Sequence, residues 1–224
     1  MALPVAFLLG FSFNPVDFLW SFHHGLEPMP EEVRERAATI GRYANFLGDA
    51  LILGFVAVLA LRNSLAAARL GLHLYQWKTN AVLGVAAGVL LILMQRLVSK
   101  STPRNSSHPF VYQARRGSVL LWVFIFIVGA FSEELWIALC LVTLAITGHS
   151  TSVSVALTAI VFAAVHYGYR LGAFAVALKG IMAALLFLWS GSLILTFLFH
   201  FIGNLGSLYR ARQDAFERSE GLIR

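Results

Sequence analysis

Long runs of apolar residues, separated by short polar segments, dominate the chain from residue 44 to residue 209. A helix that crosses a bilayer needs about 20 consecutive, mostly apolar residues. Four runs meet this requirement directly: 44–61, 79–97, 171–189 and 192–209. The pattern therefore predicts a protein built from membrane-spanning helices.

Three further segments are less regular. Residues 118–147 form an apolar run with few interruptions, and a helix of this length is about 45 Å long. We interpret it as one long or bent span, with Gly129 as the expected bend. Residues 152–167 are the shortest predicted span. Residues 4–22 are read as either a further span or an interfacial helix, because Asn14, Pro15 and Asp17 interrupt them.

These runs together predict an all-α fold, a polytopic transmembrane bundle of six to eight helices. We divide the chain into an N-terminal segment (1–43), a transmembrane core (44–209) and a short cytoplasmic tail (210–224). The first segment contains the additional span or interfacial helix. No repeat or low-complexity tract divides the core.

Composition agrees with a membrane protein. Residues of the AVILMFWYC set make up 58% of the chain, and only 12% are charged. A soluble domain has about 25% charged residues, so this chain has too few to cover a water-facing surface. A disordered chain, a coiled coil and a nucleic-acid-binding module are excluded on the same ground. The single cysteine, Cys140, excludes an internal disulfide.

The basic residues predict an orientation. With six spans, 13 of the 17 lysines and arginines fall on one side of the membrane. Loops rich in lysine and arginine stay in the cytoplasm. We therefore expect a multi-pass protein of the cell membrane, in contact with lipid, whose basic loops and C-terminal tail are cytoplasmic.

Ionisable side chains inside membrane spans are costly, and they are functional hypotheses by default. Within the predicted spans of the core, and apart from Arg96 at the end of the run 79–97, the acidic and basic residues are Asp49, Glu133, Glu134, His166, Lys179 and His200, with Asn204 as the main amide. Two acids, two histidines and an amide from three helices contain the parts that hydrolysis needs: a general base, an imidazole and donors for an oxyanion.

The spacing of these residues restricts their roles. Glu133 and Glu134 are consecutive, so on a helix their side chains point about 100° apart and serve different partners. His200 lies four residues before Asn204, which places both on one helix face. Measured from residue 118, Glu133 is about 22 Å along its helix, whereas His166 is near the cytoplasmic end of its span. Counted in this way the two depths disagree, and a strongly tilted helix, or one that begins outside the hydrocarbon region, would reconcile them.

Two other chemical interpretations remain open. Two histidines and a glutamate are also a zinc ligand set. We expect no metal and no other cofactor, because the closely spaced histidines of helical zinc proteases are absent. A small transporter is the other alternative, with Asp49, Glu133 and Lys179 as a proton relay.

Three motifs then occur in order, each in its own apolar run. They are Glu133-Glu134, Phe162-Ala163-Ala164-Val165-His166 and His200-Phe201-Ile202-Gly203-Asn204. They resemble the motifs EExxxR, FxxxH and HxxxN of the CPBP family, the CAAX protease and bacteriocin-processing intramembrane endopeptidases. The stretch Ser190-Gly191-Ser192-Leu193 is similar to the T-G-S-L stretch of that family.

The resemblance implies an intramembrane endopeptidase of the glutamate type. Glu133 would activate water with help from His166, while His200 and Asn204 would orient water or hold the oxyanion. Glu134 would be a supporting acid, and Phe162 a packing residue. The implied substrates are membrane-associated proteins or peptides, either CAAX-like C termini or leader and sorting peptides.

The chain departs from the family pattern at one position. The arginine of EExxxR falls on Ala138. Apart from Arg96 at the end of the run 79–97, Lys179 is the only cation inside a predicted span, and we hypothesise that it compensates by pairing with Glu134 or Asp49. The alternative function is a non-catalytic family member: a membrane scaffold, an immunity protein or a regulator.

Overall fold

The structure is a computed structural model that describes residues 20, 23–24, 30–99, 118–166 and 172–219. The principal elements of these residues are α3 (Glu31–Arg62), α4 (Ser64–Arg69), α5 (Trp77–Ser99), α7 (Val119–Ile146), α8 (Thr151–Val165), α9 (Gly172–Ser190) and α10 (Leu193–Ser219). The expected helix at residues 4–22 lies outside the described part, apart from Trp20. The predicted all-α bundle is confirmed.

Four of these helices are long and apolar enough to cross a membrane. The qualifying segments are Glu35–Arg62 of α3, Trp77–Arg96 of α5, Val119–Ile146 of α7 and Leu193–Arg210 of α10. Two shorter apolar helices accompany them, Thr151–Ala164 in α8 and Phe174–Ser190 in α9. The chain is therefore a helical membrane protein.

Two expected boundaries need correction. α3 begins at Glu31, so the division between residues 43 and 44 falls inside a continuous helix. α10 continues to Ser219, so the division between residues 209 and 210 also falls inside a helix. Both helices extend beyond their apolar runs into polar sequence. The long run 118–147 forms one continuous helix that passes through Gly129, in agreement with a single span.

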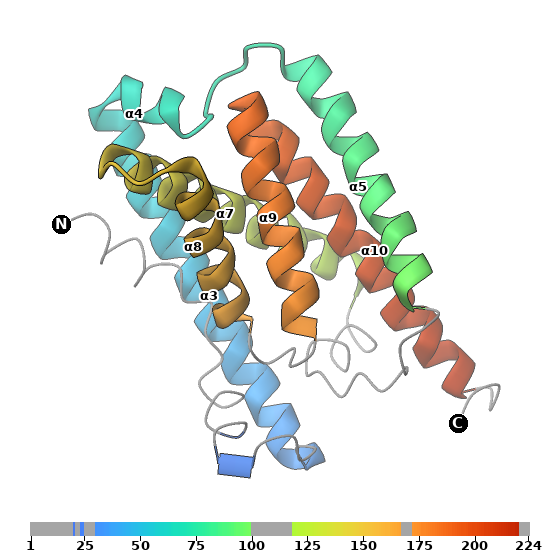
Figure 1. Cartoon of the computed structure of the whole chain (residues 1–224). Coiled ribbons are helices and arrows are strands. Elements are labelled where there is room, and N and C mark those ends of the chain that lie inside the picture. Colours follow the sequence, from blue (N-terminus) through green and yellow to red (C-terminus); the bar gives the residue numbers. More distant parts are fainter. Residues whose placement is uncertain (1–19, 21–22, 25–29, 100–117, 167–171, 220–224) are drawn as a thin grey trace.

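α7 is the central helix of the bundle. In an apolar 18-residue window of its span 61% of the residues are buried, against 17% in the corresponding window of α3. α5 packs along α10 at one edge of the molecule, and α3 lies on the other side against α7 (Figure 1). α8 and α9 pack on each other beside α7. Helices on several sides of α7 therefore determine where its polar residues point.

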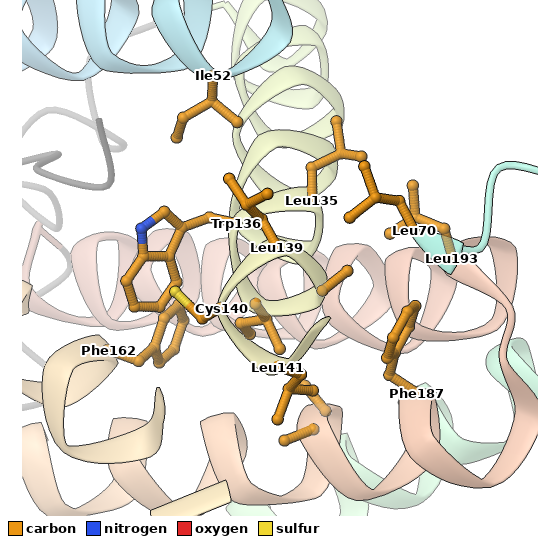
Figure 2. Packing of buried hydrophobic residues seen from close by; sticks show 14 of the residues in the cluster. Ile52, Leu70, Leu135, Trp136, Leu139, Cys140, Leu141, Phe162, Phe187 and Leu193 are labelled. Carbon is orange, nitrogen blue, oxygen red and sulfur yellow. The ribbon is translucent and has the colours of Figure 1, made fainter. Parts of the chain in front are cut away.

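The hydrophobic core surrounds α7. Figure 2 shows α7 between Ile52 of α3, Phe162 of α8, Phe187 of α9 and Leu193 of α10. These side chains are at most 5% exposed. Ala138, at the position of the family's arginine, is fully buried in this same cluster. At this point α7 is therefore surrounded by apolar side chains.

Glycines allow α5 and α10 to approach closely. Two glycines on each helix lie at the contact: Gly84 and Gly88 on α5, and Gly203 and Gly206 on α10. A Cβ atom added at Gly84 would lie only 2.6 Å from the carbonyl oxygen of Leu195. Small residues at such contacts are a general device for packing helices within membranes. The close contact between α5 and α10 therefore depends on glycine at these positions.

The turn between α9 and α10 is fixed by the connection between α4 and α5. The Leu193 amide donates to the Gly71 carbonyl at 3.3 Å, and His73 Nε2 contacts the Gly191 carbonyl at 2.9 Å. Gly71 has a φ of +74°, and an added Cβ there would lie 2.7 Å from the Leu193 nitrogen. Both the backbone conformation and the close approach therefore require glycine at position 71.

We predict that Gly84→Ala destabilises the protein by about 1–3 kcal/mol, because the new methyl group overlaps backbone that cannot move aside. Thermal unfolding in detergent measures the effect. Gly54→Ala on α3 is the matched control, since nothing lies within 4 Å of its added Cβ. Equal midpoints for the two variants would contradict the close packing of α5 on α10.

Candidate active site

The hairpin of α7 and α8 places Glu133 and His166 at the same depth. Glu133 lies 13 residues before Ile146, where α7 ends. α8 has 15 residues and ends at His166, its C-cap. Counted from the turn that the two helices share, both side chains are therefore about 20 Å away. The two depths, which disagree when counted from residue 118, agree when counted from this turn, because α8 ends halfway along the longer α7.

His166 faces Glu133 with a defined ring nitrogen. Its Nδ1 lies 2.7 Å from the carbonyl oxygen of Phe162, which only accepts hydrogen bonds, so Nδ1 carries the proton. In the neutral ring Nε2 is then an acceptor, and it lies 3.9 Å from Glu133 Oε1. The rings of Phe162 and His166 are in contact, with centroids 4.6 Å apart. Phe162 thus positions the histidine with both its backbone and its ring.

His200 lies between the two consecutive glutamates. Its Nδ1 is 2.7 Å from Glu134 Oε1, and its Nε2 is 3.2 Å from Glu133 Oε2. Each contact is favourable only with a proton between nitrogen and oxygen. The three groups therefore hold two protons between them, either as an imidazolium with two carboxylates or as a neutral ring with one carboxylic acid. Both states have a net charge of −1.

Exposure divides these residues into two pairs. The side chains of Glu133 and His166 are 22% and 17% exposed, whereas those of His200 and Glu134 are 2% and 0% exposed. Glu133 and His166 are therefore within reach of a reactant. His200 and Glu134 lie behind them and hold Glu133 from the protein side.

Lys179 brings a positive charge to the buried pair. Its Nζ donates a 2.8 Å hydrogen bond to Asn204 Oδ1, and it interacts electrostatically with Glu133 and Glu134. The hydrogen-bonded partner is therefore Asn204, rather than Glu134 or Asp49 as hypothesised. Lys179 lies 11 residues before the end of α9, and Asn204 lies 11 residues after the start of α10. The hairpin therefore places them side by side.

Asp49 has a partner that the motifs do not indicate. The hydroxyl of Ser132, the residue before Glu133, donates a hydrogen bond to Asp49 Oδ1. The available signal was the position of an acid inside an apolar run. Its partner depends on how α3 packs on α7, which the sequence pattern does not encode. Within the described residues, no three His, Cys, Asp or Glu side chains are arranged to hold a metal ion.

Comparison with known proteins identifies the region that contains this site. Residues 115–206 match the family model described as type II CAAX prenyl endopeptidase Rce1-like. This region is thus similar to the CPBP family, and the match covers less than half of the chain. The match spans the helices that carry Glu133, His166, Lys179, His200 and Asn204, whereas α3, α4 and α5 lie outside it. No curated protein and no solved structure matches the chain.

The resemblance expected from the three motifs is thereby confirmed. The family is one of proteases, so a CAAX-type peptidase is the activity indicated at the level of the family. The family description does not assign roles to single residues. The roles below are therefore argued from the geometry of this CPBP site.

We predict that Lys179→Met lowers stability by about 1–3 kcal/mol, because Asn204 loses its donor and the unit of Glu133, His200 and Glu134 loses its counter-charge. Thermal unfolding of the purified protein measures the loss. Leu178→Met, at an exposed position of the same helix, is the control. An unchanged midpoint and unchanged activity for Lys179→Met would mean that the lysine does not support the site.

Proposed function

We propose that this protein is an intramembrane endopeptidase of the glutamate type, which hydrolyses a peptide bond of a membrane-associated protein or peptide. The observation that carries the proposal is the pair of acceptors formed by Glu133 Oε1 and His166 Nε2, 3.9 Å apart. Two acceptors at this separation suit a water molecule that donates one hydrogen to each of them. Such a water has its lone pairs directed away from both and toward a substrate.

Glu133 is the proposed general base. It takes a proton from the water as the oxygen attacks the peptide carbonyl carbon, and His166 orients the same water through Nε2. The attack gives a tetrahedral intermediate with one negative oxygen. When the C–N bond breaks, the proton held by Glu133 passes to the departing amine, which restores the carboxylate. His200 and Glu134 keep Glu133 in place through both steps.

Asn204 is the proposed donor to the oxyanion. Because Lys179 donates to its Oδ1, the amide is oriented with its Nδ2 hydrogens available to another acceptor. Lys179 adds a positive charge near the site where negative charge develops. Both nitrogens of His200 already face glutamates, so we assign His200 to orienting Glu133.

The substrate class follows from the family and remains part of the proposal. CAAX-like C termini and leader or sorting peptides are the candidates, presented to helices in contact with lipid. The bias of basic residues supports a cytoplasmic position for the basic loops and the C-terminal tail. The mechanism uses water and side chains alone, so we propose that it needs no metal or other cofactor.

One observation favours a second candidate function. Ala138 replaces the motif's arginine and is fully buried among apolar side chains. If Lys179 does not replace that charge, the polar cluster serves packing, and the protein is a non-catalytic scaffold, immunity protein or regulator. Cleavage assays with site variants separate the two functions.

Glu133→Gln and His166→Ala should each lower kcat/KM by at least about 100-fold, since each removes a group that holds or deprotonates the water. Purified protein in liposomes, incubated with a panel of membrane-tethered peptides that includes a prenylated CAAX peptide, provides the assay. His149→Ala, at an exposed histidine beyond the end of α7, is the matched control. A parent that cleaves no peptide, with variants that fold equally well, would establish the scaffold function.

We also predict that chelation leaves activity unchanged, because the proposed chemistry uses no metal. Cleavage is measured after dialysis against EDTA and again after addition of Zn²⁺. Loss of activity on dialysis and its return with zinc would refute the metal-free mechanism and favour the zinc ligand set.

A further inference from the structure

α3 reaches the active site at the contact between Asp49 and Ser132. The Ser132 hydroxyl donates to Asp49 Oδ1, and Ser132 itself is fully buried. Ser132 directly precedes Glu133 on α7. Asp49 lies outside the region that matches the CPBP family, so the family motifs attach no role to it.

Asp49 belongs to the face of α3 that packs on α7. Ile52 and Val56, three and seven residues further on, are each 3% exposed and belong to the central core. Tyr43 and Phe46 are strongly exposed, which is typical of a surface that contacts lipid. A carboxyl group in a span is costly unless it faces a partner inside the protein. Ser132 is such a partner.

The contact persists in either protonation state of Asp49. The Ser132 hydroxyl has one proton and lies near two acceptors, Asp49 Oδ1 and the Gly129 carbonyl, the latter at 3.0 Å. An ionised Asp49 accepts that proton. A protonated Asp49 instead donates to Ser132 Oγ, while the hydroxyl turns to Gly129. An asparagine at position 49 keeps an acceptor oxygen there, whereas an alanine removes the contact.

Ser132 and Glu134 hold α7 from nearly opposite sides. Successive residues on a helix are rotated by 100°, so residues two apart point about 160° away from each other. Ser132 is attached to α3 through Asp49, and Glu134 is attached to α10 through His200. Glu133 lies between these two attachments. Rotation of α7 in either direction would stretch one of them.

We propose that Asp49 is a positioning residue of this active site, which holds α7 through Ser132 so that Glu133 faces His166 and His200. The inference rests on the proposed function in one respect, the catalytic role of Glu133. The link between α3 and α7 is testable without it. α3 is thereby part of the site, although the family match does not include it.

The test is a double-mutant cycle with Asp49→Ala, Ser132→Ala and both together, measured by thermal unfolding and by cleavage of the best peptide. Each single change should lower kcat about 10- to 100-fold, as expected for a misplaced base, with KM changed less than about twofold. The double variant should be no worse than either single variant. Asp49→Asn should stay near the parent, as should the control Leu51→Ala on the exposed face of α3.

The outcomes separate this inference from the proposed function. Additive losses in unfolding would overturn the link, whatever the activity. Positioning through Ser132 would be overturned if Asp49→Ala had the same kcat as the parent protein. It would also be overturned if the kcat of Asp49→Asn were as low as that of Asp49→Ala. If the parent cleaves nothing but the two changes remain coupled in unfolding, the proposed function fails while the link between α3 and α7 stands.

Discussion

Glu133 and Glu134 point in different directions, so inside a membrane each carboxyl group needs a polar partner on its own side. His200 lies between them and contacts both. Polar groups that are buried away from water in a bilayer need partners within the protein. Consecutive glutamates on a helix diverge by about 100°, and a single ring contacts both only from a position between them. The packing of α10 against α7 provides that position. The imidazole consequently joins the two helices at the site.

Much of this arrangement could be predicted from the sequence. Apolar runs locate the helices, and the order of the three motifs indicates which polar residues converge. Counting along α7 from residue 118 leaves the depth of Glu133 unmatched with that of His166, because the two helices meet at the other end of α7. Counting from the shared turns predicts both contacts, that of Glu133 with His166 and that of Lys179 with Asn204. The contact of Asp49 could not be predicted, since it depends on how α3 is rotated against α7.

The helices outside the family match take part in the structure of the site. α5 lies along α10, the helix that carries His200 and Asn204, and it does so through glycines that bring the two backbones together. α3 covers α7 next to Glu133. The helices that carry the three motifs are thus held by helices that carry none of them. The relative positions of the side chains in the site therefore depend on the packing of α5 against α10 and of α3 against α7.

The contacts of the turn between α9 and α10 affect where these two helices lie along the bundle axis. Gly71 and His73 hold that turn, and Lys179 and Asn204 are each about 16 Å from it along their helices. A longer or shorter connection before α5 would slide both helices together along the bundle axis. The lysine and the amide would stay paired but move relative to α7. The contacts of Gly71 and His73 with the turn thus help to set the depth at which both side chains lie.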